Sequence, residues 1–563
     1  MHKLKILFIA LYSDKYPSIG ESHGISVIAG SVMEKCGDLP IDFFEVIDMV
    51  ASNYNNLEDV IKKIKLHEPN VIGISLNYGT YNILKEIFKK ITSYLTRINP
   101  LFLLGGPIAT YVPEFILKEI YNKAYIVIGE GDETVPLIIR SWYNNTTYES
   151  IPNLCYLIND RVYFSQRKLV PINRLSLPYR GHIDLVIESR AQIFIESSRG
   201  CSWCGCTFCL RGLTDSKGKK SEYRRFDFTR LSTDILKLVS YGANTFTFAD
   251  EDFLGNDVED NNDFVNNFES FCISNELQLT FDASFTVHSI FSSKYSEEEI
   301  QKRKSQLKKL KKIGLRKIFL GIESGSDSQL KRFGKGHSSS EALMAINIVK
   351  ELEIEFELGF IMFDPLCSLI EIEENLDFLS RHNLIKYVSS LSSELRLQIK
   401  TQYVKEMIIQ EIKHNIVLFD RKIDLDTISF SYKYLHKDVS IFVNNVKHWN
   451  KRIREIHYPL KNLSRYGKGG ILGKYRNQIV KINIKLRNNY FQLLKKGIQE
   501  INSGNVEFIG GEEMDNIMYE CSICIIDLSK KLPRRILDNR IFKNVLDICQ
   551  SEIENLKSKF YFS

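Results

Sequence analysis

Short apolar runs alternate with amphipathic stretches through the first 140 residues of the chain. The runs are rich in β-branched residues and end in Gly, Asn or Asp, which is typical of strands covered on both faces of a parallel sheet. They lie at residues 5–10, 41–47, 71–76, 101–104 and 125–128, and helical periodicity is clear at 24–35 and 81–98. This pattern predicts a doubly wound α/β domain, flavodoxin-like or Rossmann-like, over residues 1–140. Its ligand is expected at the carboxyl ends of the strands.

The pattern changes twice along the rest of the chain. A hairpin-like segment at 153–165 with Pro171 and Pro178 predicts a linker over 141–190 with little core of its own. Strands are then predicted at 192–196, 245–248, 278–283, 317–320 and 355–363, and helices at 229–241, 297–313, 338–352 and 370–381. This repeat predicts a full or partial TIM-type (β/α) barrel over 191–388, with its site at the strand C-termini. Residues 389–563 have a mainly α-helical pattern.

Four of the 11 cysteines lie between Cys201 and Cys209, directly after the predicted strand at 192–196. Thiolates gathered on one short loop can hold an iron–sulfur cluster or zinc. Cys201, Cys206 and Cys209 give the spacing C-x4-C-x2-C, whereas structural zinc takes four protein ligands, usually as two spaced pairs. The spacing favours a cluster with one open iron, and zinc or an inert buried set remain alternatives. Cys204 is the spare cysteine in this interpretation, although it could replace Cys201.

Composition narrows the class of protein. The 563 residues are 44% hydrophobic and 26% charged, as in folded multidomain proteins, and no apolar run of about 18 residues predicts a membrane span. The net charge of +6 is small for this length and does not argue for a nucleic-acid partner. The chain opens with Met-His-Lys-Leu-Lys and shows no cleavable apolar leader, so a cytoplasmic location with reduced cysteines is expected.

Over residues 1–385 the chain resembles the cobalamin-dependent radical S-adenosylmethionine (SAM) enzymes. The run Arg-Gly-Cys-Ser-Trp-Cys-Gly-Cys-Thr-Phe-Cys is similar to their cluster loop, with a first gap one residue longer than the usual C-x3-C-x2-C. The resemblance implies that Cys201, Cys206 and Cys209 hold a [4Fe–4S] cluster whose fourth iron chelates SAM. It assigns to SAM binding the residues Asp250, Glu251, Asp252, Glu323, Ser324, Gly325 and Gly359.

These SAM assignments rest on three segments in the order that the family requires. The acids at the end of the strand at 245–248 would meet the methionine ammonium group, with a helix cap and solvated acids as the alternative. Glu323, in the run Phe-Leu-Gly-Ile-Glu-Ser-Gly, would accept hydrogen bonds from the ribose hydroxyls. Gly359 would admit the adenine, and a plain buried strand is the alternative there.

The N-terminal domain is similar to cobalamin-binding domains. The resemblance places the corrinoid on strand-end residues, namely Ser75, Asn77, Gly105, Gly106, Pro107, Gly129, Glu130 and Gly131. Glycines at these ends let the main chain approach a flat cofactor. The usual Asp-x-His-x-x-Gly sequence is absent, and His23 is interpreted as an ordinary loop histidine.

The resemblance implies an enzyme that uses a [4Fe–4S] cluster, SAM and cobalamin, with a reductant such as flavodoxin or ferredoxin. The expected reaction is methyl transfer to an unactivated carbon of a natural-product intermediate or precursor peptide, started by a 5′-deoxyadenosyl radical. A cobalamin-assisted rearrangement, cyclisation or ring contraction without methyl transfer is the alternative within the family. A cobalamin- or metal-sensing binding protein is the alternative from another class, although a sensor would need no ribose-binding acid.

Overall fold

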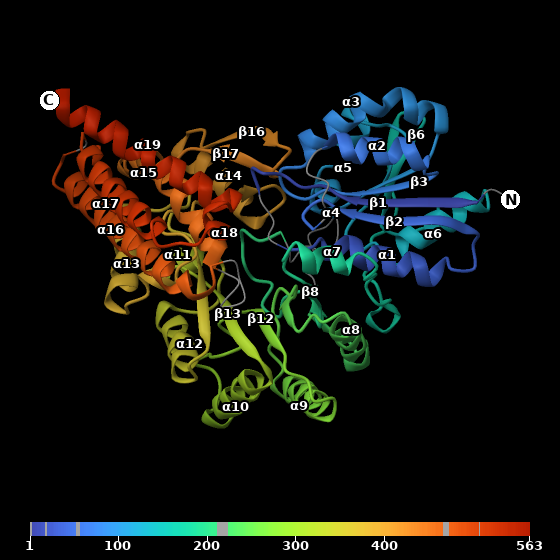
Figure 1. Cartoon of the computed structure of the whole chain (residues 1–563), viewed down its shortest axis with the longest axis horizontal. Coiled ribbons are helices and arrows are strands. Elements are labelled where there is room, and N and C mark those ends of the chain that lie inside the picture. Colours follow the sequence, from blue (N-terminus) through green and yellow to red (C-terminus); the bar gives the residue numbers. More distant parts are fainter. Residues whose placement is uncertain are drawn as a thin grey trace.

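A computed structural model describes residues 3–16, 20–51, 57–210, 223–464, 472–505 and 507–562 (Figure 1). The N-terminal sheet contains the strands β1 (Leu4–Ala10), β2 (Ile41–Asp48), β3 (Val71–Ser75), β4 (Leu101–Gly105) and β5 (Tyr125–Val127). They are parallel and ordered β2-β1-β3-β4-β5. This is the flavodoxin-like order, so the predicted fold of the first domain is confirmed.

Helices cover both faces of the N-terminal sheet. They are α1 (His23–Lys35), α2 (Leu57–His67), α3 (Tyr81–Ile98), α4 (Gly106–Tyr111), α5 (Pro113–Glu119) and α6 (Thr134–Tyr143). Alternate residues of β1 enter two separate cores, because successive side chains of a strand point to opposite faces. Leu7 packs in one core with Ile61 and Leu84 of α2 and α3, whereas Phe8 packs in the other with Ala29 and Ile138 of α1 and α6.

The hairpin predicted at 153–165 is present as β6 (Leu154–Ile158) and β7 (Arg161–Phe164). It pairs antiparallel to β5 and extends the N-terminal sheet to seven strands. Leu154 and Cys155 are fully buried there. These residues pack into the two cores of the N-terminal domain, so the hairpin belongs to that domain and has no separate core among the described residues. The rest of the segment holds η1 (Ile172–Arg174) and α7 (Ile183–Glu188).

A second parallel sheet forms the partial barrel. Its strands are β8 (Phe194–Ile195), β11 (Thr245–Phe248), β12 (Thr280–Phe285), β13 (Leu315–Glu323) and β14 (Glu355–Phe360), in the order β14-β13-β12-β11-β8. The helices are α8 (Phe228–Ser240), α9 (Val258–Ser274), α10 (Glu297–Ile313), α11 (Asp327–Arg332), α12 (Ser339–Glu351) and α13 (Leu369–Arg381). The ribbon β9 (Ser198–Arg199) and β10 (Arg224–Arg225) leads into and out of the cysteine loop region. The predicted partial (β/α) barrel is confirmed.

Helix α10 coincides with its prediction because both ends are encoded locally. The Ser296 side chain caps the amide of Glu299, and acids fill the first turn, where they favour the positive end of the helix. Gly314 ends the helix with a φ of 135°. A Cβ there would lie 2.1 Å from the backbone oxygen of Leu279, so only glycine fits.

The C-terminal region is mainly helical, as predicted. It contains η2 (Ile385–Tyr387), α14 (Gln402–His414), α15 (Lys437–Ser464), η4 (Gly473–Tyr475), α16 (Arg476–Asn502), α17 (Gly511–Ser529), α18 (Arg534–Leu537) and α19 (Arg540–Phe562). A small antiparallel sheet, β15 (Leu397–Gln398), β16 (Phe419–Asp424) and β17 (Ser429–Tyr432), was not predicted.

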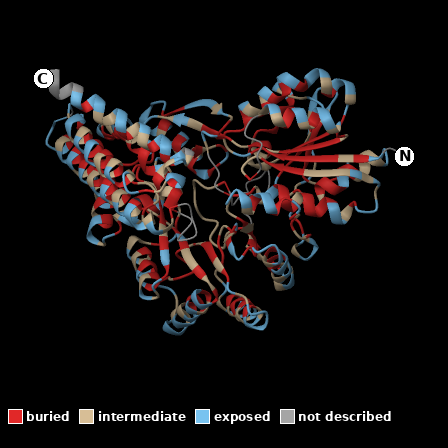
Figure 2. Ribbon diagram, viewed as in Figure 1, coloured by how far each residue is buried: buried red, intermediate tan, exposed pale blue. Residues whose placement is uncertain are grey.

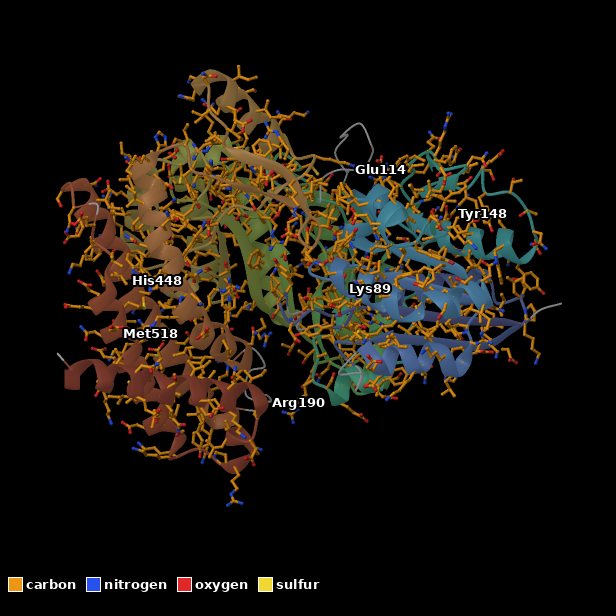
Figure 3. All side chains as sticks on the ribbon, turned by 90° about the horizontal axis from the view of Figure 1, so that it is seen from above. Lys89, Glu114, Tyr148, Arg190, His448 and Met518 are labelled. Carbon is orange, nitrogen blue, oxygen red and sulfur yellow. The ribbon has the colours of Figure 1, made fainter. Side chains whose placement is uncertain are left out.

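The C-terminal helices share one apolar cluster with the barrel, and buried residues run from the strands into α15 and α16 (Figure 2). Seen from above, the N-terminal domain with Lys89 and Glu114 and the helical region with His448 and Met518 lie at opposite ends (Figure 3). No helix in the described ranges is long and apolar enough to cross a membrane.

Candidate cofactor site

The cysteine loop, residues 200–210, is fastened to the segment that follows α11. The Trp203 indole donates to the carbonyl of Gly334 (2.8 Å), and the Thr207 hydroxyl donates to that of Arg332 (2.9 Å). The Trp203 ring also lies against Gly336, where a Cβ would come within 1.9 Å of the indole. These contacts hold the loop at the carboxyl ends of the barrel strands, as predicted.

Three of the four cysteines surround one buried lysine that sequence analysis missed. Lys335 is 7% exposed, and its ammonium lies 3.6 Å from a carboxylate oxygen of Glu323. Burial disfavours its charge, but Cys206, Glu323, Cys201 and Cys209 act in the opposite direction and raise the pKa of Lys335. Burial in turn raises the pKa of the Cys206 thiol to about 11, against the attraction of Lys335. The Lys335 ammonium would therefore offset part of the negative charge of the cysteine thiolates.

Cys204 has a different environment from the other three cysteines. It has a φ of 48°, in the left-handed region, and its sulfur donates to the carbonyl of Cys201. A side-chain hydrogen bond from Cys204, opposed by burial, lowers the pKa of the Cys201 thiol to about 7. The assignment of Cys201 as a ligand and Cys204 as the spare stays a prediction.

The donor set of the cysteine loop suits an iron–sulfur cluster, because thiolates are the usual ligands of its irons. Nowhere in the described ranges do three or more His, Cys, Asp or Glu side chains come close enough together to share one metal ion. Cys201, Cys206 and Cys209 all act electrostatically on Lys335, so the three thiols lie in the neighbourhood of one ammonium group. A [4Fe–4S] cluster offers a separate iron to each thiolate and therefore suits such spacing.

The acids at the end of β11 hold the cysteine loop. Asp250 is buried and accepts hydrogen bonds from the hydroxyls of Ser197 (2.7 Å) and Ser198 (2.5 Å). Burial raises the pKa of Asp250 to about 6, although these hydrogen bonds oppose the shift. Glu251 accepts from the amide of Gly200 (3.2 Å). Glu251 thus contacts the cysteine loop itself, whereas Asp250 contacts the two serines that precede the loop.

Asp252 completes this set of acids. It is fully buried and accepts a hydrogen bond from the hydroxyl of Ser202, next to Cys201. Asp250, Glu251 and Asp252 thus fix the loop at three successive points. A carboxylate that positions the loop differs from one that contacts SAM. Of the three acids, Glu251 lines the cavity of about 460 Å³ described below, and Asp250 lines the cavity of about 500 Å³ next to it.

Glu323 ends β13 in the left-handed region, with a φ of 68°. Its neighbours Ser324 and Gly325 both hydrogen-bond to Asn375 of α13, each at 2.7 Å, and Ser324 is fully buried. These two residues therefore anchor the strand end, whereas Glu323 projects beside the cysteines. At Gly359 a Cβ would lie 3.0 Å from an aromatic carbon of β13, so this glycine permits close packing of neighbouring strands.

A cavity of about 460 Å³ lies between the carboxyl ends of the N-terminal strands and the cysteine loop. It is lined by seven of the eight residues assigned to cobalamin: Ser75, Gly105, Gly106, Pro107, Gly129, Glu130 and Gly131. Ser198, Gly200 and Glu251 form its opposite wall. At Gly105 a Cβ would meet nothing within 4 Å, so open space lies directly above β4. We call this space the interdomain cavity; its glycine-lined wall fits a flat cofactor.

Asn77, the eighth residue, lines an adjoining cavity of about 500 Å³ instead. That cavity reaches the inner wall of the barrel at Thr247 and Ser284. His23 lines both cavities. Its ring nitrogens are buried and make no hydrogen bond to any described residue, although Nε2 lies 3.8 Å from a carboxylate oxygen of Glu196. Sequence analysis interpreted His23 as an ordinary loop histidine and did not predict that it lines both cavities.

Arg199, directly before the cysteine loop, joins the two domains. Its guanidinium donates to both carboxylate oxygens of Asp132 (2.9 and 3.0 Å) and to Glu196 (3.2 Å). Asp132 follows β5 in the N-terminal domain and is 3% exposed. A second bridge links Arg224 to Glu130. The two walls of the interdomain cavity are therefore held together by buried, charge-assisted hydrogen bonds.

Two family models match the chain. A model for the B12 binding domain matches residues 11–139, and a model for the radical SAM superfamily matches residues 195–379. The chain is 28% identical over 355 residues to 4′-phospho-dehydrooxetanocin synthase of Priestia megaterium. That match covers 60% of this chain and 46% of the relative, so it spans less than half of the relative's length. An uncharacterized methyltransferase of Pyrococcus horikoshii is 24% identical over 371 residues, which cover 64% of this chain and 73% of that protein.

Solved structures with the same fold include two cobalamin-dependent proteins. The radical SAM enzyme OxsB with aqua-cobalamin bound has a TM-score of 0.78 at 19% identity, covering 98% of this chain and 84% of that chain. The radical SAM methyltransferase TsrM from Kitasatospora setae has a TM-score of 0.55 at 13% identity, covering 73% of this chain and 75% of that chain. At these identities the likeness concerns the fold, and with OxsB it extends through the C-terminal helices.

Proposed function

Because the chain belongs to the cobalamin-dependent radical SAM enzymes, with a B12 binding domain followed by a radical SAM domain, we propose that it transfers a methyl group to an unactivated carbon. The proposed substrate is a small natural-product intermediate or a precursor peptide. The reductant would be a flavodoxin or ferredoxin. The cofactors are a [4Fe–4S] cluster, SAM and cobalamin.

The interdomain cavity is the observation that carries this proposal. Its floor consists of the strand-end glycines, among them Gly105, and its other wall includes Gly200, next to Cys201. When bound, the cluster with SAM supplies a carbon-centred radical, and cobalamin supplies a methyl group. Residues of this cavity would thus hold cobalamin, and the cluster ligand Cys201 follows its wall residue Gly200 directly, which would bring both cofactors within reach of a shared substrate.

The residues of the chain have separate tasks in this proposal. Cys201, Cys206 and Cys209 hold the cluster, and the Lys335 ammonium offsets part of their charge. Glu323 accepts hydrogen bonds from the ribose hydroxyls of SAM. The adjoining cavity of about 500 Å³, which reaches Thr247 inside the barrel, has space for the substrate. Closure between the two domains excludes water from the reaction.

A rearrangement without methyl transfer is the second candidate. It is favoured by the 28% identity to a relative named as a synthase of a phosphorylated product. In that case the corrinoid would not pass a methyl group to the product. The uncharacterized methyltransferase of Pyrococcus horikoshii supports the first candidate instead.

A substrate-free experiment separates the two candidates. The holoenzyme is reduced and incubated with SAM that carries a ¹³C label in its methyl group, and the corrinoid is extracted and analysed by mass spectrometry. Methyl transfer predicts labelled methylcobalamin together with an equal amount of S-adenosylhomocysteine. Formation of 5′-deoxyadenosine without either compound would contradict methyl transfer and support rearrangement. A Cys206→Ala variant, which lacks the radical-forming cluster, is the control for 5′-deoxyadenosine.

A further inference from the structure

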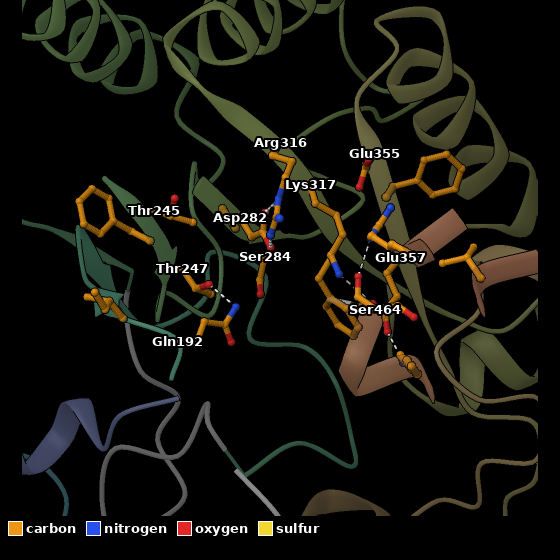
Figure 4. Close-up of a pocket in the computed structure, with 18 of the residues that line it drawn as sticks. Gln192, Thr245, Thr247, Asp282, Ser284, Arg316, Lys317, Glu355, Glu357 and Ser464 are labelled. Atoms are coloured by element: carbon orange, nitrogen blue, oxygen red, sulfur yellow. Dashed lines mark hydrogen bonds and ion pairs between the residues drawn. The ribbon is translucent and has the colours of Figure 1, made fainter. Parts of the chain in front are cut away.

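A third cavity, of about 700 Å³, lies at the opposite end of the barrel from the cysteine loop. Its walls include Thr245, Asp282, Lys317 and Glu357, which lie in the first halves of β11, β12, β13 and β14, and α15 and α16 close it from outside (Figure 4). We call it the basal cavity. None of the residues assigned above to the cluster, SAM or cobalamin lines it.

The lining of the basal cavity is unusually polar for the inside of a barrel. Barrel interiors are normally filled by branched apolar side chains. Here Thr245 and Thr247 of β11, and Lys317 of β13 with Glu357 of β14, point inward, as Figure 4 shows. Buried polar and charged groups cost free energy unless they find partners, so a hollow polar interior indicates a ligand with polar groups.

Positive charge exceeds negative charge around the basal cavity. Among its described lining residues, seven are Lys or Arg and three are Asp or Glu. The Glu357 carboxylate lies between two ammonium groups, Lys317 at 3.0 Å and Lys461 at 2.6 Å. Arg316 is paired with Asp282. One carboxylate shared by two half-buried lysines leaves net positive charge on the wall.

Arg487 adds a buried guanidinium with no carboxylate partner among the described residues. It lies on α16, is 8% exposed and donates through one terminal nitrogen to the carbonyls of Ile385 (2.9 Å) and Val388. Its Nε is buried and makes no hydrogen bond to any described residue. Burial lowers the pKa of Arg487 to about 10, so it stays charged at neutral pH. A buried, uncompensated charge of this kind is stable when an anion pairs with it.

We propose that the basal cavity binds a phosphorylated small molecule through Arg487, Lys461 and Lys317. A guanidinium and two ammonium groups match the charge of a phosphate group. The hydroxyls of Thr245 and Thr247 and the amide of Gln192 line the same space and suit the polar remainder of a sugar phosphate. A volume of about 700 Å³ accommodates a ligand of that size. The basal cavity shares Thr247 and Ser284 with the adjoining cavity, whereas its cationic residues Arg487, Lys461 and Lys317 line the basal cavity alone among the three cavities described.

Ribose 5-phosphate, ribose and inorganic phosphate serve as probes for this site, measured by isothermal titration calorimetry on the holoenzyme. We expect ribose 5-phosphate to bind one equivalent per chain and ribose not to bind. Binding of inorganic phosphate would show that the anion alone is recognised. Arg487→Gln and, separately, Lys461→Gln are each expected to weaken the binding tenfold or more, because each removes a charged hydrogen-bond donor.

Lys481→Gln is the matched control, because Lys481 is exposed on the same helix α16 and does not line the cavity. It is expected to bind ribose 5-phosphate like the parent protein. Iron and cobalamin contents of every variant show whether it has folded. A Cys206→Ala protein, which would lose the cluster, is expected to keep the binding, so this inference and the proposed function fail independently. The proposal would be overturned if the parent protein does not bind ribose 5-phosphate. It would also be overturned if the folded Arg487→Gln and Lys461→Gln variants bind ribose 5-phosphate as tightly as the parent protein.

Discussion

Arg199→Met removes the buried link between the two domains while keeping an apolar side chain of similar length. In the parent protein the Arg199 guanidinium donates two hydrogen bonds to Asp132 and two to Glu196. Asp132 lies in the N-terminal domain, and Glu196 ends the strand that leads to the cysteine loop. The substitution therefore tests whether this residue holds the two walls of the interdomain cavity together.

The expected cost follows from burial. The side chains of Arg199 and Asp132 are 16% and 4% exposed, so removing the cation leaves a buried carboxylate without its partner. Such a loss costs about 3–5 kcal/mol of unfolding free energy. Asp132→Asn keeps a neutral acceptor and leaves Arg199 its bonds to Glu196, so about 1–3 kcal/mol is expected. The double variant is expected to lose less than the sum, with a coupling energy of ~0.5–3 kcal/mol.

Urea unfolding of the parent protein, the two single variants and the double variant measures the coupling energy between Arg199 and Asp132. Cobalamin affinity measures what the loss of Arg199 does to the interdomain cavity. We expect Arg199→Met to weaken cobalamin binding, because the two walls separate. Arg140→Met is the control, since Arg140 pairs with the exposed Asp38 and with the carbonyl of Lys35 within one domain and is expected to leave cobalamin affinity unchanged. Additive effects of Arg199→Met and Asp132→Asn, or unchanged cobalamin affinity in Arg199→Met, would refute the reasoning.

Three further predictions concern the cofactors. Cys204→Ala is expected to keep most of the iron of the reconstituted protein, whereas alanine at Cys201, Cys206 or Cys209 is expected to abolish cluster assembly. Loss of the iron in Cys204→Ala would change the ligand assignment. Gly105→Leu is expected to abolish cobalamin retention, because its side chain enters open space above β4, and parent-level retention would move the corrinoid elsewhere. Glu323→Gln is expected to lower SAM affinity by about 1.5–3 kcal/mol, measured by equilibrium dialysis, if a charged hydrogen bond to the ribose is lost; an unchanged affinity would contradict that role.

The sheet strands could be predicted from sequence because their apolar runs are local signals. Parallel strands then bring their carboxyl ends to one edge, so Ser75, Gly105 and Gly129 could be grouped without knowledge of the structure. Asn77 differs because it lies two residues beyond the end of β3, where the chain has already turned toward the neighbouring cavity. The C-terminal sheet escaped prediction because its strands are short and β16 is mostly exposed.

The residues that sequence analysis missed act through tertiary contacts. Lys335 follows α11 in a Gly-Lys-Gly run, and only the fold brings its ammonium to the cysteines. Arg199 precedes the cysteine loop, but its partner Asp132 is 67 residues away along the chain. Asp250 was predicted at the correct strand end, and the hydroxyls of Ser197 and Ser198 define the contacts that it makes. Composition and spacing carry no signal for such pairings.

The central claim is that the cluster and the corrinoid occupy opposite walls of one cavity. Electron paramagnetic resonance of the holoenzyme, with the cluster reduced and cobalamin as cob(II)alamin, tests it directly, because both centres are then paramagnetic. The account predicts a spin–spin interaction that broadens the cob(II)alamin signal, and its loss in the Cys206→Ala variant that lacks the cluster. A cob(II)alamin signal that is identical with and without the reduced cluster would contradict a shared cavity.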